Sequence, residues 1–280
     1  MAKLKFTQKQ IEQLLEDVHT GIINPLNLSN EYYLAVAEYL EKGIYSGFKN
    51  ALSDIKFGTP DYELLKELRD NIYMFSAAKD FQMVKEMSAA LVDEQGNVKT
   101  FKEFKEDARG IYTTYTGGTD DDGFKEGWLH TEYTTAIDCA ASAKEWSRVE
   151  QSKKLFPYLR YIATSDDLVC EICGPLDGIC LPVDSPFWDD NLGPNHFNCR
   201  CYTEQLELEE GQDKETDEAD VEERTASSQE TKNDLFNFNA GKDRVIFKSE
   251  GEGKHPYFEV EKGYKKFAEE NFGLPLPGDE

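Results

Sequence analysis

Two short stretches, Cys170-Glu-Ile-Cys173 and Pro194-Asn-His-Phe-Asn-Cys-Arg-Cys201, decide how the second half of this 280-residue chain folds. A Cys-x-x-Cys pair lets two thiolates converge on one tetrahedral ion, and a His-x-x-Cys pair some twenty residues later completes the four ligands. The ligands that this spacing predicts are Cys170, Cys173, His196 and Cys199. The site is expected to hold Zn²⁺, which contributes on the order of 10 kcal/mol to the folding of such a small unit.

Cys201 is the alternative fourth ligand. In an extended segment, Cys199 and Cys201 point to opposite faces, so one thiol meets the metal and the other packs inward. The spacing between His196 and Cys199 gives the more compact second half of the site, which favours Cys199. Four protein ligands close the coordination shell, whereas a catalytic zinc keeps one position for water. We therefore expect a structural site.

The cysteines also allow other interpretations. Cys180 follows a turn and is expected to be a small buried hydrophobic residue, and all of the clustered cysteines could be reduced core residues. A redox Cys-x-x-Cys pair is disfavoured because no thioredoxin-like βαβ pattern surrounds it. Five of the six cysteines lie within 32 residues beside a histidine, and only Cys139 is remote. Metal binding explains this clustering better than a disulfide framework does.

Three further residues are expected to support the site. Asp177 and Gly178 lie in Leu-Asp-Gly-Ile, which has the Asp-Gly signature of a tight hairpin turn. Arg200 lies between two cysteines, where it either pairs with a carboxylate such as Asp166 or Asp167 or extends into solvent. The first alternative would hold the second half of the site in place.

The composition limits the kind of protein. The chain has 31 basic and 55 acidic residues and a formal charge of −24, which makes nucleic-acid binding by net charge implausible. It has no run of eighteen apolar residues, and the N-terminus turns polar before a signal-peptide core can form. We therefore expect a soluble protein that is not secreted and does not contact a membrane.

From residue 7 to about 155 the apolar residues recur with helical periodicity. Asn30 and Thr59-Pro60 are typical helix starts, and Thr100 with Glu103 forms a capping-box pair. A long helix is expected from Leu129 to Gln151. The β-branched and aromatic stretch that follows, Tyr158 to Thr164, predicts a short strand, so the small domain is expected to be α+β.

The composition changes again after the second cysteine stretch. Thirteen acidic and three basic residues lie between Glu204 and Asp234. Such a segment buries too little apolar surface to offset its chain entropy, which predicts a disordered linker. The expected organisation is α+β, with a helical region (1–124), a zinc-stapled domain (125–206), an acidic disordered linker (207–234) and a tail that docks on another surface (235–280).

These residues resemble a known family. A long helix (Thr131 to Val149), a strand, Cys-x-x-Cys-x-x-Leu-x-Gly and Pro-Asn-His-Phe-Asn-Cys-Arg-Cys occur in the order found in the Mu F-like phage head morphogenesis proteins. The resemblance covers roughly residues 125 to 206. A generic zinc knuckle needs neither the Leu-Asp-Gly turn nor the arginine, so these motifs are fairly specific.

The resemblance implies a minor capsid protein, present in a few copies in the virion and in the host cytoplasm during assembly. Its partners would be the portal protein, the major capsid protein or both, at the portal vertex. It would influence packaging or ejection of the genome, and contact with packaged DNA is conceivable. The sequence shows no nucleophile paired with a base, so no enzymatic activity is expected.

Two other functions compete with this one. A zinc-finger nuclease of the HNH or treble-clef type needs a histidine base and a second metal-binding histidine or asparagine. Here His196 is already needed as a ligand, which leaves only Asn195 and Asn198. The tail could instead be a toxin fragment or effector, but it lacks residues that could activate a nucleophile, which favours a docking peptide.

Overall fold

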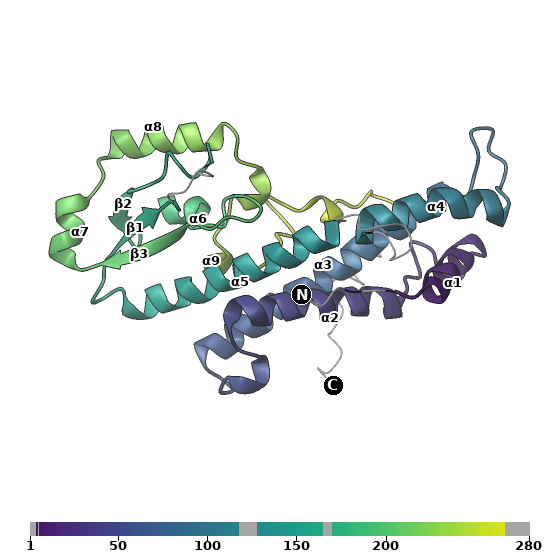
Figure 1. Ribbon diagram of the computed structural model, residues 1–280, viewed down its shortest axis with the longest axis horizontal. Coiled ribbons are helices and arrows are strands. Elements are labelled where there is room, and N and C mark those ends of the chain that lie inside the picture. Colours follow the sequence, from purple (N-terminus) through teal and green to yellow (C-terminus); the bar gives the residue numbers. More distant parts are fainter. Residues whose placement is uncertain (1–3, 5, 118–127, 165–169, 267–280) are drawn as a thin grey trace. The chain divides into compact units, whose positions relative to one another are not determined.

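The computed structural model describes residues 4, 6–117, 128–164 and 170–266 (Figure 1). The chain is 57% helical and contains a small antiparallel sheet, so the expected α+β class is confirmed. None of the helices in these ranges is long and apolar enough to cross a membrane.

The chain divides into two compact units, each built from separate parts of the sequence. The first unit comprises Met1–Lys42, Asp70–Tyr133 and His255–Glu280, and the second comprises Gly43–Arg69 and Thr134–Lys254. This division differs from the four consecutive segments expected from the sequence, because long helices continue from one unit into the other. The expected boundary after residue 124 lies outside the described residues.

The helices begin where local sequence predicts them. The Thr100 hydroxyl accepts from the backbone N–H of Glu103, and the Glu103 carboxylate accepts from the backbone N–H of Thr100, which confirms the capping box. Such caps satisfy orphan amides within a single turn, so they need no tertiary context. The main helices are α1 (Gln8–His19), α2 (Asn30–Phe48), α3 (Pro60–Ala89), α4 (Phe101–Thr116) and α5 (Trp128–Ser152).

Within the first unit, residues 255–266 of the C-terminal tail pack on this chain's own α3. The buried Lys79 ammonium lies 2.6 Å from the Glu132 carboxylate, and the Tyr257 hydroxyl donates to that carboxylate at 3.0 Å. The Gln82 amide donates to the backbone carbonyls of Tyr257 and Glu259. A buried ion pair is stable only when its remaining hydrogen-bonding capacity is filled, and here the tail helps to fill it.

The second unit contains a three-stranded antiparallel sheet in the order β2-β1-β3. The strands are β1 (Tyr158–Ile162), β2 (Cys180–Pro182) and β3 (Tyr202–Leu206). Tyr158 on β1 pairs with Pro182 on one side and with Leu206 on the other. The buried core beside this sheet includes Trp146, Trp188, Cys173 and Cys199, so the cysteine cluster is part of the core.

The acidic segment is ordered, and the expectation of a disordered linker at 207–234 is wrong. It contains α7 (Leu208–Lys214) and α8 (Glu218–Gln229). Thr216 between them donates its backbone N–H to the Cys180 carbonyl and accepts the Cys180 N–H on its hydroxyl. The Tyr158 hydroxyl donates to Glu215 at 2.8 Å. The segment is held by backbone and polar contacts with the sheet, which composition alone does not reveal.

Residues after this segment also belong to the second unit. Phe236, Phe238 and Ala240 are buried, and the Asn239 amide donates to the Trp188 carbonyl at 2.9 Å. Smaller elements complete the unit, namely α6 (Phe187–Asn191), α9 (Ala240–Asp243) and the 3₁₀ turns Leu52–Asp54 and Asp234–Phe236. The first unit has one further described 3₁₀ turn, Pro256–Phe258.

Replacement of Gly211 by alanine tests whether α7 is docked. A Cβ at Gly211 would lie 2.2 Å from the Tyr158 ring, so we expect Gly211→Ala to lower the free energy of unfolding by about 1–3 kcal/mol. Urea denaturation followed by tryptophan fluorescence measures this loss. Gly110→Ala is the matched control, because no atom lies within 4 Å of a Cβ there and alanine favours the helix. A neutral Gly211→Ala would contradict the docking of α7.

Candidate metal centre

All five predicted thiol and imidazole donors lie close together in the second unit. They form two overlapping groups, Cys170 with Cys173 and His196, and Cys173 with Cys199 and Cys201. In each group the ligand atoms lie within 4.8 Å of one another. Cys173 belongs to both groups, and its Sγ lies 3.8 Å from Sγ of Cys199. The two halves of the motif therefore meet at the Cys173–Cys199 pair.

Tight turns form the first half of the centre. The backbone N–H of Cys173 donates to the Cys170 sulfur at 3.3 Å, and the N–H of Gly174 donates to the Cys170 carbonyl at 2.9 Å. These bonds turn both thiols to the same side. Cys173 is buried, whereas Cys170 is half-buried at the edge.

The second half begins with His196. Its Nδ1 lies 2.9 Å from the Phe197 carbonyl, so a proton on Nδ1 would be donated there and Nε2 would carry the lone pair. Interaction with the Cys199 thiol, opposed by burial, raises the pKa of His196 to about 9. His196 and Cys199 belong to different donor groups, so Cys173 is the residue that joins the two groups.

Cys199 and Cys201 do not point to opposite faces, so that expectation is wrong. Asn198 has a φ of 59°, in the left-handed region, and β3 begins only at Tyr202. The residues between them are therefore not an extended strand, and both thiols lie near Cys173. Cys199 is the more deeply buried of the two.

The donor set fits a tetrahedral thiophilic ion. With Zn–S bonds of about 2.3 Å, two thiolates of a tetrahedral site lie about 3.8 Å apart. The distance between the sulfurs of Cys173 and Cys199 is 3.8 Å. Hydrogen bonds from the neighbouring thiols Cys173 and Cys201 hold the pKa of Cys199 well below its usual range, so a thiolate forms readily at this position. Thiolates and neutral imidazole are the ligands that zinc prefers.

A second layer of polar side chains surrounds the thiols. The buried Tyr161 hydroxyl donates to the Cys173 sulfur at 3.2 Å, and the buried Asn195 amide donates to the Tyr161 oxygen at 2.9 Å. Such partners orient metal ligands and tune their basicity. No sequence motif assigns Tyr161 to the site, and Asn195 was considered only as a possible nuclease residue. The two lie 34 residues apart, and only their contact assigns them here.

The predicted supporting residues occupy distinct positions. The Asp177 carboxylate accepts the backbone N–H of Ala163 at 2.8 Å, and Gly178 has a φ of 80° while its N–H donates to the Tyr161 carbonyl. Asp177 and Gly178 form a turn that leads into β2. This turn does not by itself join β1 to β2. The Arg200 carbonyl accepts from the Thr164 hydroxyl at 2.8 Å. Asp166 and Asp167 lie outside the described residues.

Lys232 is a buried cation near the thiols that sequence analysis missed. Its side chain donates to the Asp190 carbonyl, and burial lowers the pKa of Lys232 to about 8 while the nearby charges of Asp190, Cys173 and Cys199 oppose that shift. A cation in this position offsets the negative charge of a thiolate-rich site. Lys232 is one of only three basic residues between Glu204 and Asp234. A rare cation in an acidic segment is the signal in the sequence that could have pointed to it.

The remaining predicted cysteine role agrees with the structure. Cys180 is fully buried, its sulfur lies 3.8 Å from the Gly211 carbonyl, and it belongs to neither donor group. Cys199, Arg200 and Cys201 also line a half-open groove of about 880 Å³ along α5, within the second unit.

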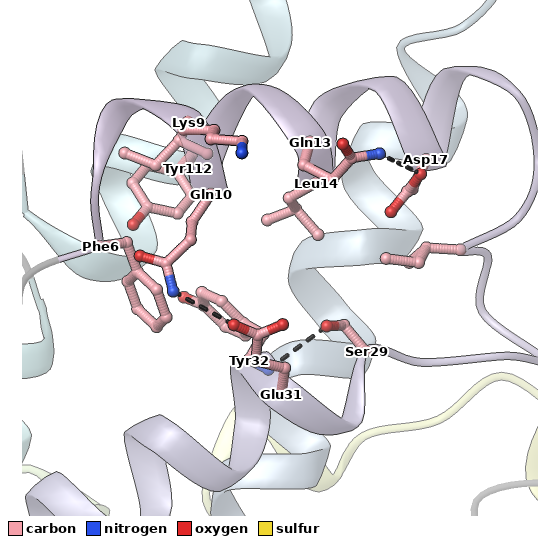
Figure 2. A pocket seen from close by; sticks show the side chains of 12 residues that line it. Phe6, Lys9, Gln10, Gln13, Leu14, Asp17, Ser29, Glu31, Tyr32 and Tyr112 are labelled. Atoms are coloured by element: carbon pink, nitrogen blue, oxygen red, sulfur yellow. Dashed lines mark hydrogen bonds between the residues drawn. The ribbon is translucent and has the colours of Figure 1, made fainter.

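A cavity of about 290 Å³ lies in the first unit (Figure 2). Its wall is apolar, with Phe6 stacked on Tyr32 at a centroid distance of 4.9 Å and Leu14 beside them. Its rim carries amide–carboxylate pairs, such as Gln10 donating to Glu31 at 3.1 Å. This volume suits an apolar side chain, and the lining contains no nucleophile paired with a base.

Comparison with known proteins identifies the family. The family model described as "Phage Mu protein F like protein" matches residues 49–204, more than half of the chain. The Mu-like prophage FluMu F protein of Haemophilus influenzae is similar to this chain, with 32% identity over 78 residues. That match covers 28% of this chain and 18% of the length of the relative. No solved structure matches significantly.

The matched range contains every predicted metal ligand and the strand and turn that position them. The chain therefore belongs to the family of Phage Mu F-like proteins.

Proposed function

We propose that this protein is a minor structural component of a phage head, built in at the portal vertex, where it acts in packaging or ejection of the genome. The observation that carries this proposal is the family match over residues 49–204. Membership in a head morphogenesis family implies association with other capsid components. The portal protein, the major capsid protein or both are the proposed partners.

The metal in this proposal is a structural Zn²⁺ held by Cys170, Cys173, His196 and Cys199, with Cys201 as the substitute for Cys199. Bound there, zinc supplies a cross-link between the two halves of the motif and no reaction step. Tyr161 donates to Cys173, and the Asp177–Gly178 turn holds the loop that carries Cys170 and Cys173. The burial of Cys173 and Cys199 within the core supports a structural role.

The protein is proposed not to be an enzyme. A nuclease would need His196 or a nearby asparagine to act as base or second metal ligand. His196 lies in one donor group with Cys170 and Cys173, and the fully buried Asn195 donates to Tyr161 and to the Asn191 carbonyl. These engagements support the structural alternative.

The charge of the chain is compatible with a position inside a DNA-filled shell. With 55 acidic and 31 basic residues, the protein is repelled by a polyanion and would not be captured nonspecifically by the packaged genome. Its attachment would then depend on protein contacts and not on DNA.

Quantitative mass spectrometry of purified heads tests the proposal. We expect the protein in heads in far fewer copies than the major capsid protein, and we expect heads lacking it to be deficient in packaged or ejected DNA. Crosslinking in these heads should join it to the portal protein. Its absence from heads, or DNA cleavage by the purified protein that is lost in His196→Ala with folding retained, would contradict the proposal.

A further inference from the structure

The acidic helix α8 contacts the loop that carries the first pair of cysteines. The Arg224 guanidinium donates from Nε to the Pro175 carbonyl at 2.7 Å and from a terminal nitrogen to the Asp177 carbonyl. Its other terminal nitrogen pairs with Asp220, one turn earlier on α8, at 3.0 Å. One side chain therefore spans the segment that directly follows Cys173.

The loop leaves these two carbonyls available. Its internal turns use other carbonyls: Cys170 accepts from Gly174, Cys173 from Leu176, Gly174 from Asp177, and Leu176 from Ile179. The carbonyls of Pro175 and Asp177 take no part in these turns, and Arg224 binds both. The guanidinium fork thus adds two hydrogen bonds to a loop that has no regular secondary structure.

Contacts on either side of Arg224 keep α8 in place. Val221 packs against the core cluster that contains Cys173 and Cys199. Before the helix, Thr216 pairs with the backbone of Cys180 on β2, and after it Lys232 donates to the Asp190 carbonyl. Arg224 therefore acts from a helix that is anchored to the same core as the thiols.

We propose that Arg224 is a positioning residue of the metal centre: by holding the Pro175 and Asp177 carbonyls, it keeps Cys170 and Cys173 in the geometry that receives the ion. The acidic segment would then determine how tightly the metal is held. This inference rests on the proposed metal site and extends it to a segment after the residues that the family model matches.

The test is metal exchange in the full-length protein. Zn²⁺ transfer to a chromophoric chelator measures affinity and release, and Co²⁺ substitution gives thiolate charge-transfer and ligand-field bands that report ligand geometry. We expect Arg224→Ala to weaken metal binding roughly 10- to 100-fold, as loss of a ligand-orienting contact does, and to shift the Co²⁺ bands. Arg224→Lys keeps the charge but cannot bridge two carbonyls, so an intermediate effect is expected.

Two matched variants separate positioning from general surface effects. Asp220→Asn removes the ion pair but keeps the carbonyl bonds, and Lys214→Ala removes a comparable helix-surface pair on α7 with Glu210. Both should exchange metal like the wild type. If both Arg224 variants exchange metal and give Co²⁺ spectra like those of the wild type, this inference is overturned. The proposed metal site itself would then still stand. A wild-type protein that takes up neither ion would instead overturn the proposed metal site itself.

Discussion

Removal of the metal is expected to unfold the core around Trp188 while most of the helical content of the protein remains. The thiols of Cys173 and Cys199 lie within that core, and the sheet beside it has only three short strands. Structural zinc contributes on the order of 10 kcal/mol to the folding of small units. This is more than the free energy of unfolding that such a small sheet would have without the metal. The effect should include α7 and α8, because both are anchored to this sheet and core.

Fluorescence and circular dichroism measure this result. Trp146 and Trp188 both lie in the metal-centre core, whereas Trp128 belongs to the first unit and is 49% exposed. In a Trp128→Phe background, chelation should therefore shift the emission to the red while the far-UV helical signal falls only partly. Added Zn²⁺ should restore the original spectrum. If elemental analysis confirms that the metal has been lost and the emission is unchanged, the metal does not hold this core together.

Replacement of Cys173 is expected to damage the metal centre more than replacement of any other donor, because Cys173 is the residue common to both groups. A structural site worth about 10–16 kcal/mol over four ligands gives about 2.5–4 kcal/mol per ligand. Cys173→Ala should therefore weaken zinc binding by roughly two to three orders of magnitude. Chelator competition and elemental analysis measure the affinity and the stoichiometry.

Cys180→Ala is the matched control for this experiment. It removes the same sulfur from a site that is also fully buried in the second unit, but outside both donor groups. It should lose some packing energy and still bind one metal ion. If Cys180→Ala lost as much metal as Cys173→Ala, the effect would be due to core packing and not to ligation. Among the partly redundant thiols, Cys199→Ala should weaken binding more than Cys201→Ala, because Cys199 is more deeply buried.

Local patterns were sufficient for the helix starts and for the choice of candidate donors. The capping residues Thr100 and Glu103 lie within one turn of each other, and their bond forms regardless of what packs nearby. The cysteine and histidine spacing selected candidate donors that lie in two overlapping groups. The cap and each half of the donor motif involve only a few consecutive residues, whereas the meeting of the two halves does not.

The errors concern residues whose surroundings come from elsewhere in the chain. An acidic stretch resembles a linker when its charges are counted, but its order depends on Thr216 meeting Cys180 and on Arg224 meeting Pro175 and Asp177. Cys199 and Cys201 would point to opposite faces only if the backbone were extended. The left-handed conformation of Asn198 interrupts an extended backbone here. No local period in the sequence encodes these contacts.

The sequence by itself determined the α+β class, the capped helices, the family and the candidate metal donors, because these depend on residue type and short spacing. Only the tertiary structure decided that α8 joins the candidate metal centre, that Tyr161 and Lys232 lie near its thiols, and that its two halves meet at Cys173 and Cys199. Those decisions depend on which groups come together once the chain has folded, and the partners are 12 to 49 residues apart in the sequence.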